Sequence, residues 1–382
     1  MIRLILAILF FLVSLLSVFK APVYFLWFLA IAVTEFPWIF MFIILAILAA
    51  GFWVHKYQVA STAIGLAALL LFISPIARAH SVAASLKKNL AAAFGGDSTK
   101  TDSDTVKPFT VVRMFGDDPG RIPYSSLTYV TYPDKAMSLD FYPSQQTGKK
   151  PCVIIVHGGS WSSGDSKQLP ELNSYLARLG YNVAAINYRK APKYQNPAPV
   201  QDIQAALKYL RANADELKID TNNFVLLGRS AGAQIALLAA YTLHDKDIKG
   251  VIDFYGPADM VWGYSAPANP LIMNSRAVMR HYLGGSYEQV PKNYVASSPI
   301  EFVNRQSPPT LIIHGENDVL VAYEHSRRLD QKLQDNGIKH FWLQLPWATH
   351  GFDFNLKGPG GQLSTYCVER FLKSVCPSDP KG

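Results

Sequence analysis

The sequence predicts an α/β domain that follows a block of apolar helices. The front of the chain is apolar and almost free of charge, whereas the chain from residue 109 onward alternates short apolar strands with amphipathic helices. Between them lies a polar, glycine-containing stretch of the kind that separates domains. A chain of 382 residues has room for about two or three domains of typical size.

The first 78 residues predict membrane-spanning helices. Between Arg3 and Arg78 the ionisable side chains are few: Lys20, Glu35, His55 and Lys56. A helix needs roughly 20 residues to cross the hydrocarbon core of a bilayer. The apolar runs 36–54 and 57–77 meet this length, so we expect a spanning helix in each.

The apolar region before residue 36 predicts one tilted span, with Lys20 extending toward the headgroups. A re-entrant pair of short helices is the alternative, and a cleaved signal peptide is disfavoured because no small-x-small site precedes Lys20. We therefore expect about three spanning helices and a multi-pass, integral membrane region over 1–94. The basic residues are nearly balanced between the two sides, which leaves the orientation open.

Two features are expected after the spans. Val82, Leu86 and Leu90 stand at helical spacing beside basic residues, which predicts a juxtamembrane helix on the lipid headgroups. Residues 95–108 are small and polar, which predicts a flexible linker. The catalytic domain is then expected over 109–382.

The charge distribution bears on the partners. Residues 1–100 carry +5 of the formal net charge of +8, so the positive excess suits anionic membrane lipids and does not favour nucleic acid. The three cysteines have no metal-ligand spacing, and Cys152 and Cys367 are expected to be packed thiols.

Eight strands and five helices are expected after residue 109. The strands are 127–132, 137–142, 152–158, 181–188, 224–228, 250–256, 310–315 and 341–346. The helices are 168–179, 198–213, 231–243, 323–336 and 361–375. This alternation predicts a mainly parallel sheet with helices on both faces, and an antiparallel hairpin of the first two strands at one edge.

A G-x-S-x-G pattern, residues 228–232, stands between a predicted strand and a predicted helix. Functional groups gather at the carboxyl ends of parallel strands, and a sharp turn there exposes the serine hydroxyl. Glycines at Gly228 and Gly232 let the strand and the helix pass closely. Ser230 is therefore the candidate nucleophile.

A serine nucleophile needs a base and an acid that orients the base. His350 follows the last predicted strand and is the candidate base, whereas His157 is expected to shape the oxyanion loop and His314 to belong to a turn. Asp318 follows the strand 310–315 and completes the chain order Ser, Asp, His. Asp353 is the competing acid.

Main-chain N–H groups are expected to stabilise the negative oxygen that forms on attack. The stretch HGGSW supplies Gly158, Gly159 and Ser160, and Ala231 begins the helix after the nucleophile. The sequence leaves open which of the three loop residues donates.

These motifs resemble the α/β-hydrolase superfamily, over about residues 125–375. The resemblance is to the esterase and lipase group related to hormone-sensitive lipase and to the bacterial feruloyl and acetyl esterases. It is carried by HGGSW, INYRKAP, GRSAGA, HGEND and THGF, in that order. It implies Ser230 as nucleophile, His350 as base, Asp318 as acid, an oxyanion hole at the HGG loop and Ala231, and a mechanism that needs no metal or cofactor.

The resemblance has two departures. The loop lacks the third glycine of many lipase-like members, which is similar to the acetyl-esterase and kynurenine-formamidase-like branches. The N-terminal spans are unusual, although prenylcysteine methylesterases look similar in combining spans with this loop. Arg189 and Asp202 match positions that look structural in the family and predict an ion pair.

The long segment 257–309 predicts a cap that lines an acyl or leaving-group pocket, with ordinary packing as the alternative. Three tryptophans are expected near this pocket: Trp161, Trp262 and Trp347.

The expected function is a membrane-anchored serine carboxylesterase that hydrolyses acyl esters of small or lipid-like molecules through an acyl-enzyme. An amidase or formamidase with the same triad is the first alternative. A catalytically inactive domain that binds at the membrane is the second, and the intact triad positions argue against it.

Overall fold

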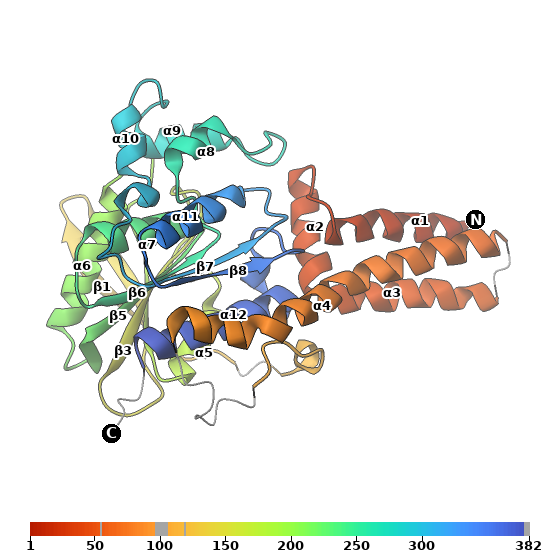
Figure 1. The fold of residues 1–382 in the computed structure, drawn as a ribbon, viewed down its shortest axis with the longest axis horizontal. Helices are drawn as coiled ribbons and strands as arrows, with labels where there is room; N and C mark the ends of the chain where they lie inside the picture. Colours follow the sequence, from red (N-terminus) through yellow and green to blue (C-terminus); the bar gives the residue numbers. More distant parts are fainter. Residues whose placement is uncertain (54–55, 96–105, 118–119, 378–382) are drawn as a thin grey trace.

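The computed structural model describes residues 1–53, 56–95, 106–117 and 120–377, and it contains an eight-stranded sheet in the order β1-β2-β4-β3-β5-β6-β7-β8 (Figure 1). The strands are β1 (Ser125–Tyr132), β2 (Lys135–Tyr142), β3 (Lys150–Val156), β4 (Asn182–Ile186), β5 (Ile219–Arg229), β6 (Ile248–Phe254), β7 (Thr310–Gly315) and β8 (His340–Leu345). The main helices of this domain are α5 (Pro170–Arg178), α6 (Ala198–Ala212), α7 (Ala231–Thr242), α11 (Glu324–Asp335) and α12 (Pro359–Val375).

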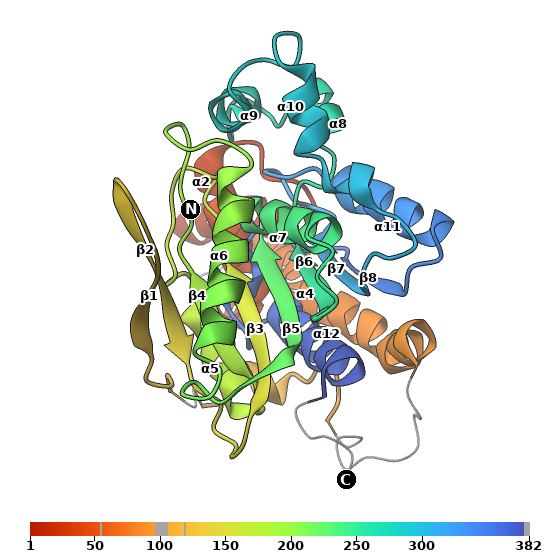
Figure 2. The same ribbon diagram turned by 90° about the vertical axis from the view of Figure 1, so that its left-hand side faces the viewer.

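The sheet is mainly parallel, as predicted. Strands β4, β3, β5, β6, β7 and β8 pair in parallel, whereas β2 pairs antiparallel with both β1 and β4. The β1–β2 hairpin forms one edge and β8 the other, as Figure 2 shows. The predicted edge hairpin is therefore confirmed.

Both faces of the sheet are covered, which explains why its central strands are apolar at successive positions. In β3, Cys152 and Ile154 belong to the core under α6, α7 and α11, whereas Val153 and Ile155 belong to the core under α5 and α12. Figure 1 shows α7 and α11 on one face and α5 and α12 on the other.

A cap stands beside the carboxyl ends of the central strands (Figures 1 and 2). It is built from α8 (Met260–Ser265), α9 (Ser275–Leu283), α10 (Pro291–Ala296) and the 3₁₀ turn η5 (Pro299–Phe302). These elements fall within the segment 257–309, where the sequence predicted a cap.

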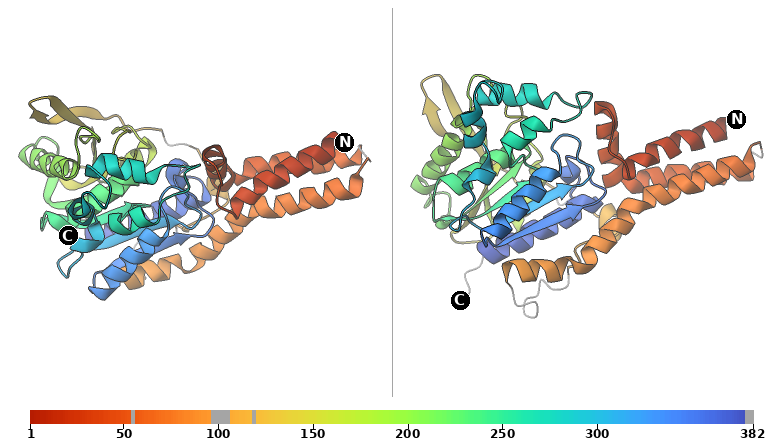
Figure 3. Two further views of the ribbon diagram at one scale, coloured as in Figure 1. Left: turned by 90° about the horizontal axis from the view of Figure 1, so that it is seen from above. Right: turned by 45° about the horizontal axis from the view of Figure 1, so that its top comes forward.

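The N-terminal region forms a separate helical bundle that extends away from the sheet (Figures 1 and 3). Its elements are α1 (Ile2–Ser14), η1 (Leu15–Ser17), α2 (Tyr24–Glu35), α3 (Pro37–Ala49), η2 (Ala50–Phe52) and α4 (Gln58–Phe94). Helices α1, α3 and α4 run side by side, and α2 lies across their end, next to the catalytic domain.

The expected single tilted span before residue 36 does not form. The chain leaves helical structure after Ser17 and re-enters it at Tyr24, and α2 meets the following helix at 87°. Pro37 explains the second break, and Pro22 disfavours helical backbone at Ala21 before α2 begins, because proline lacks an N–H donor and restricts the residue before it. Of the described helices, only α4 is long and apolar enough to cross a membrane, with α2 and α3 as a second span if the bent pair is counted as one.

The predicted juxtamembrane helix is the second half of α4 and packs on protein. Leu86, Leu90 and Phe94 are buried in the core that α12 shares, and the rings of Phe94 and Phe371 lie 4.9 Å apart. The expected position on lipid headgroups is therefore wrong for this apolar side. Most of the predicted linker, residues 96–105, lies outside the described residues.

Helix α2 is anchored to the catalytic domain at its end. The buried carboxylate of Glu35 accepts hydrogen bonds from the N–H groups of Gly360 (2.8 Å) and Gly361 (3.3 Å), at the start of α12. Asn355 Nδ2 also donates to the main-chain oxygen of Glu35, at 2.8 Å. The first N–H groups of a helix have no partner within the helix, so their bonds to the Glu35 carboxyl group hold α2 against the domain.

Candidate active site

Ser230 occupies the turn between β5 and α7. Its backbone has φ 54° and ψ −122°, an uncommon conformation for a residue with a side chain. A Cβ atom on Gly228 would lie 2.3 Å from the oxygen of Gly232, and one on Gly232 would lie 2.2 Å from the oxygen of Val156. Glycine at both positions therefore lets strand and helix approach closely, as expected.

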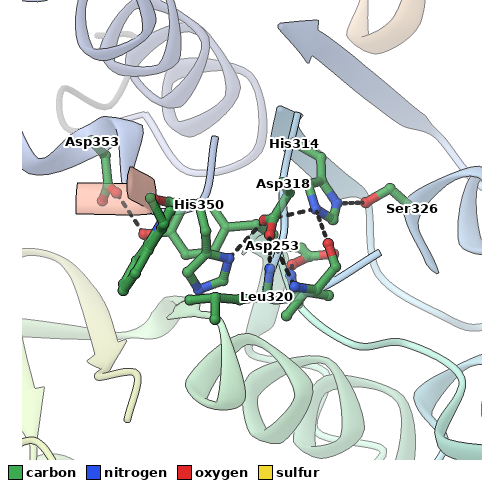
Figure 4. Close-up of polar contacts among 11 residues, drawn as sticks. Asp253, His314, Asp318, Leu320, Ser326, His350 and Asp353 are labelled. Atoms are coloured by element: carbon green, nitrogen blue, oxygen red, sulfur yellow. Dashed lines mark hydrogen bonds and ion pairs between the residues drawn. The ribbon is translucent and has the colours of Figure 1, made fainter. Parts of the chain in front are cut away.

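His350 and Asp318 are in direct contact (Figure 4). His350 Nδ1 lies 2.6 Å from Asp318 Oδ2, and the carboxylate is buried. The other carboxylate oxygen accepts the main-chain N–H groups of Leu320 (2.8 Å) and Val321 (2.9 Å). The turn after β7 thus fixes the carboxylate, and the carboxylate orients the imidazole.

His314 has a larger part than the turn role predicted for it. Its buried ring places Nε2 at 3.1 Å from Asp318 Oδ2 and 3.2 Å from the oxygen of Val321, so Nε2 carries the proton. Its Nδ1 lies 2.7 Å from the hydroxyl of Ser326. A histidine at the end of a strand, four residues before a candidate acid, was the sequence signal for this support.

Several interactions set the ionisation of Asp318. Burial alone would raise its pKa, but the electrostatic interactions and hydrogen bonds with the rings of His350 and His314 outweigh burial and hold the pKa below its usual range. Asp318 is therefore a carboxylate across the physiological pH range.

Asp353, the competing acid, is engaged elsewhere. Its carboxylate lies 2.5 Å from the Nε of buried Arg229 and accepts a hydrogen bond from the hydroxyl of Tyr255. The ring of Tyr255 in turn packs against His350, with centroids 4.3 Å apart. Arg229 lies next to the serine in the G-x-S-x-G pattern, and a buried arginine there requires a buried acid.

The oxyanion loop follows β3 and is shaped by His157. Burial lowers the pKa of His157 to about 4, so the ring is neutral; it stacks on Tyr188 and its Nδ1 lies 2.6 Å from the oxygen of Gly158. The N–H of Gly158 donates to Gln168 Oε1 at 2.7 Å. Gly158 is therefore not a free donor, because the side chain of Gln168 occupies its N–H; of the three loop residues that the sequence left open, Gly159 and Ser160 remain.

Three candidate donors remain around Ser230. The N–H groups of Gly159, Ser160 and Ala231 donate to no other residue in the described part of the chain. Within the same part, the Ser230 hydroxyl forms no hydrogen bond, including none to His350; such bonds are often long without substrate.

Ser230 and Asp318 line a pocket of about 380 Å³. Most of its other lining residues are apolar and come from the cap and the turn after Asp318, for example Ile272, Met273 and Leu320. The cap thus lines the pocket, as expected for the segment 257–309. A site of this size and apolar character suits a small acyl group.

The three tryptophans predicted to lie near the pocket occupy three different environments. Trp161 lines the pocket and stacks on Tyr282, with ring centroids 4.5 Å apart. Trp262 lies on a different surface hollow and packs against His325, and Trp347 is fully buried in the core. The prediction is wrong for Trp262, which lines a different hollow, and for Trp347, because aromatic residues near a site pack into the core at least as often as they face a ligand.

Sequence reasoning also missed one wall of the pocket. Lys20, Ala21 and Pro22, from the turn between α1 and α2, line it together with Ser230. This contact joins positions about 200 residues apart, and no pattern in the apolar N-terminal region points to it.

The predicted ion pair of Arg189 and Asp202 is present. Arg189 Nε lies 2.8 Å from Asp202 Oδ1, and the Arg189 N–H donates to the other oxygen at 2.7 Å. The pair holds the start of the INYRKAP segment against α6. In the described part of the chain, no three His, Cys, Asp or Glu side chains are grouped so that they could hold a metal ion.

A serine on a strand-to-helix turn, in a mainly parallel sheet with a His–Asp pair at later strand ends, defines the class of this protein: its catalytic domain is an α/β-hydrolase. The chain belongs to the BD-FAE family, whose model matches residues 139–333, just over half of the chain. The matched residues include Ser230 and Asp318 and end before His350.

Several curated relatives are carboxylic ester hydrolases or esterases, and the chain belongs to that class. The chain is 27% identical to the probable carboxylic ester hydrolase LipM of Mycobacterium tuberculosis, over 75% of this chain and 68% of LipM. It is 30% identical to the esterase LipC of the same organism, over 63% of each chain. It is 26% identical to the isoprenylcysteine alpha-carbonyl methylesterase ICME of Arabidopsis thaliana, over 59% of this chain and 56% of ICME. The alignments thus span between 56% and 68% of these relatives.

Solved structures share the fold of the catalytic domain. A truncated carbohydrate esterase from gut microbiota is 25% identical and has a TM-score of 0.55, covering 66% of this chain and 99% of its own. A hyperthermophilic esterase from the archaeon Pyrobaculum calidifontis is 20% identical, with a TM-score of 0.59, and covers 79% of this chain and 99% of its own.

Proposed function

We propose that the protein is a membrane-anchored serine carboxylesterase in which Ser230, His350 and Asp318 form the catalytic triad. The observation that carries this proposal is the 2.6 Å contact between His350 Nδ1 and buried Asp318, whose loop lines the same pocket as Ser230. An imidazole held at Nδ1 presents Nε2 as a base, which is the arrangement that a serine nucleophile needs.

In the proposed reaction, Ser230 Oγ attacks the ester carbonyl while His350 Nε2 takes its proton. Asp318 stabilises the resulting imidazolium, and the N–H groups of Ala231 and of the Gly159–Ser160 turn stabilise the negative oxygen. The bond between the acyl carbon and the alkoxy oxygen breaks, and the alcohol leaves with the proton from His350. Water then attacks the acyl-enzyme by the same route and regenerates the serine.

The surface of the helical bundle supports the proposed membrane anchor. Large apolar side chains are exposed on its helices, among them Ile5, Leu9, Phe42, Val59 and Leu70. An apolar surface of this extent marks a contact with lipid or protein, and α4 has the length and composition of a spanning helix. We therefore place α1, α3 and the first half of α4 in the bilayer and the catalytic domain at its surface.

A fluorophosphonate probe, which reacts with an activated serine, tests the proposal. We expect the purified full chain to be labelled and to hydrolyse 4-nitrophenyl butyrate, and Ser230→Ala to lose both properties. Ser160→Ala is a control for labelling, because it removes a different hydroxyl from the same pocket. Equal labelling of the wild type and Ser230→Ala would rule out Ser230 as nucleophile.

A further inference from the structure

The segment 18–28, here called the N-terminal wall, is bonded to the two loops that carry the His–Asp pair. The main-chain oxygen of Val18 accepts a hydrogen bond from Asn317 Nδ2 at 3.2 Å, next to Asp318. The indole Nε1 of Trp27 donates to the main-chain oxygen of His350 at 2.9 Å. The N-terminal wall therefore sits against the catalytic loops in a defined position.

The N-terminal wall is also bonded to the cap. Asn269 Nδ2 donates to the oxygen of Pro22 at 3.2 Å, and the N–H of Tyr24 donates to the oxygen of Leu271 at 3.3 Å. The pocket residues Ala266 to Met273 lie in this part of the cap. Substrate in the pocket is thus enclosed between the cap on one side and the N-terminal wall on another.

Among the residues that the structure describes, Lys20 is the only cationic side chain that lines the pocket. The other ionisable lining residues are Asp318 and His325, apart from the weakly acidic hydroxyls. Asp318 already accepts two histidines and two main-chain N–H groups. His325 is neutral, because burial lowers its pKa to about 3. Within the described residues, the pocket lining therefore offers no free carboxylate to Lys20.

The ammonium group of Lys20 is available for a ligand. Its side chain is exposed, and it forms no hydrogen bond or ion pair with the described part of the chain. A cation beside a mainly apolar pocket favours a ligand with an apolar part and a negative charge, because the apolar surface excludes water and strengthens the ionic contact.

We propose that Lys20 is a specificity-determining residue that binds a negatively charged group on the substrate, so that the enzyme prefers anionic amphiphilic acyl esters to neutral ones. The apolar part of the substrate lies against the cap, and its carboxylate or phosphate lies against Lys20. This inference rests on the proposed function and names the substrate class of the same site.

The test compares two butyrate esters, 4-nitrophenyl butyrate and 3-carboxy-4-nitrophenyl butyrate, the second of which carries a carboxylate on its phenyl ring. The full chain is assayed in vesicles of zwitterionic lipid. We expect Lys20→Gln to lower kcat/KM about tenfold for the carboxylated ester, as for loss of one partly shielded ion pair of about 1.4 kcal/mol, and less than twofold for the neutral ester. Lys20→Arg should restore most of the preference. Lys56→Gln, in the turn between η2 and α4 and outside the pocket lining, is the matched control and should change neither rate.

The results separate the inference from the function on which it rests. If Lys20→Gln changes both esters equally, or neither, the inference is overturned while wild-type hydrolysis keeps the proposed function intact. If the effect follows the charge of the vesicles and not that of the ester, Lys20 binds lipid headgroups and the inference is again overturned. If the wild type hydrolyses neither ester and the probe does not label Ser230, the proposed function itself fails.

Discussion

Trp27 Nε1 donates a hydrogen bond of 2.9 Å to the main-chain oxygen of His350, across 323 positions of the sequence. The two rings are also neighbours, with centroids 6.3 Å apart. The same loop carries Gly351, where an added Cβ would lie 3.4 Å from Ile31. The loop with the proposed base is thus held from outside the catalytic domain, by helix α2.

Trp27→Phe tests this support. Phenylalanine keeps a ring but removes the indole N–H, so His350 should lose one constraint on its position. We expect kcat to fall about threefold to tenfold, since a lost neutral hydrogen bond contributes about 1 kcal/mol, with KM for 4-nitrophenyl butyrate and the melting temperature nearly unchanged. The exposed Trp53 supplies the control Trp53→Phe. A rise in KM with constant kcat would contradict a positioning role.

Most of the site residues could be predicted from short local motifs. Ser230, Asp318 and His350 each follow a strand of recognisable pattern, so their order and their common edge of the sheet could be inferred from short stretches. Contacts between distant segments could not. The pairing of Arg229 with Asp353 spans 124 positions, and nothing local to Arg229 identifies its partner.

The N-terminal region shows a second limit of sequence patterns. Hydropathy located apolar helices but could not tell lipid-facing surface from surface that packs on protein. Leu90 and Phe94 pack on the catalytic domain, and Pro22 lines the pocket. These roles depend on the bend at Pro37 and on α2 lying across the bundle, which tertiary packing decides.

Asp318→Asn should remove most activity. The amide cannot stabilise an imidazolium at His350 as a carboxylate does. Its NH₂ group would also face donors, either the two histidine rings or the N–H groups of Leu320 and Val321. We expect kcat to fall about 10³-fold to 10⁴-fold, as for the orienting acid of other serine hydrolases. Labelling rates with the fluorophosphonate probe measure the same loss. A reduction of less than tenfold would exclude Asp318 as the orienting acid.

Asp353→Asn should act mainly on stability. The change leaves the guanidinium of Arg229 buried without its counter-ion, and breaking a buried pair in this way costs about 3–5 kcal/mol. We expect a clearly lower melting temperature in detergent, whereas Asp318→Asn should lower it less. If Asp353→Asn kept the wild-type melting temperature but lost activity, Asp353 would have the catalytic role assigned to Asp318.

The buried carboxyl group of Asp253 should make the stability of the protein depend on pH. It is fully buried in β6, and burial raises its pKa to about 7 although the N–H of Gly256 donates to it. The folded chain therefore holds a proton that the unfolded chain releases at lower pH, so this group lowers stability as pH rises from about 4 to about 7. Asp253→Asn removes that penalty because the amide is neutral throughout and its oxygen can still accept from Gly256.

The advantage of Asp253→Asn over the wild type should grow by up to about 1.4 kcal/mol per pH unit between about pH 4 and 7, and then level off. His157 and His325 act in the opposite sense. Their pKa values are lowered to about 4 and about 3, so the unfolded chain binds protons that the folded chain does not, and their contribution to stability increases as pH rises. Both histidines are present in both proteins, so their effect cancels in the difference between the two melting curves. A difference that stays constant from pH 5 to pH 8 would show that Asp253 is ionised in the folded protein and that burial is offset by interactions beyond the bond from Gly256.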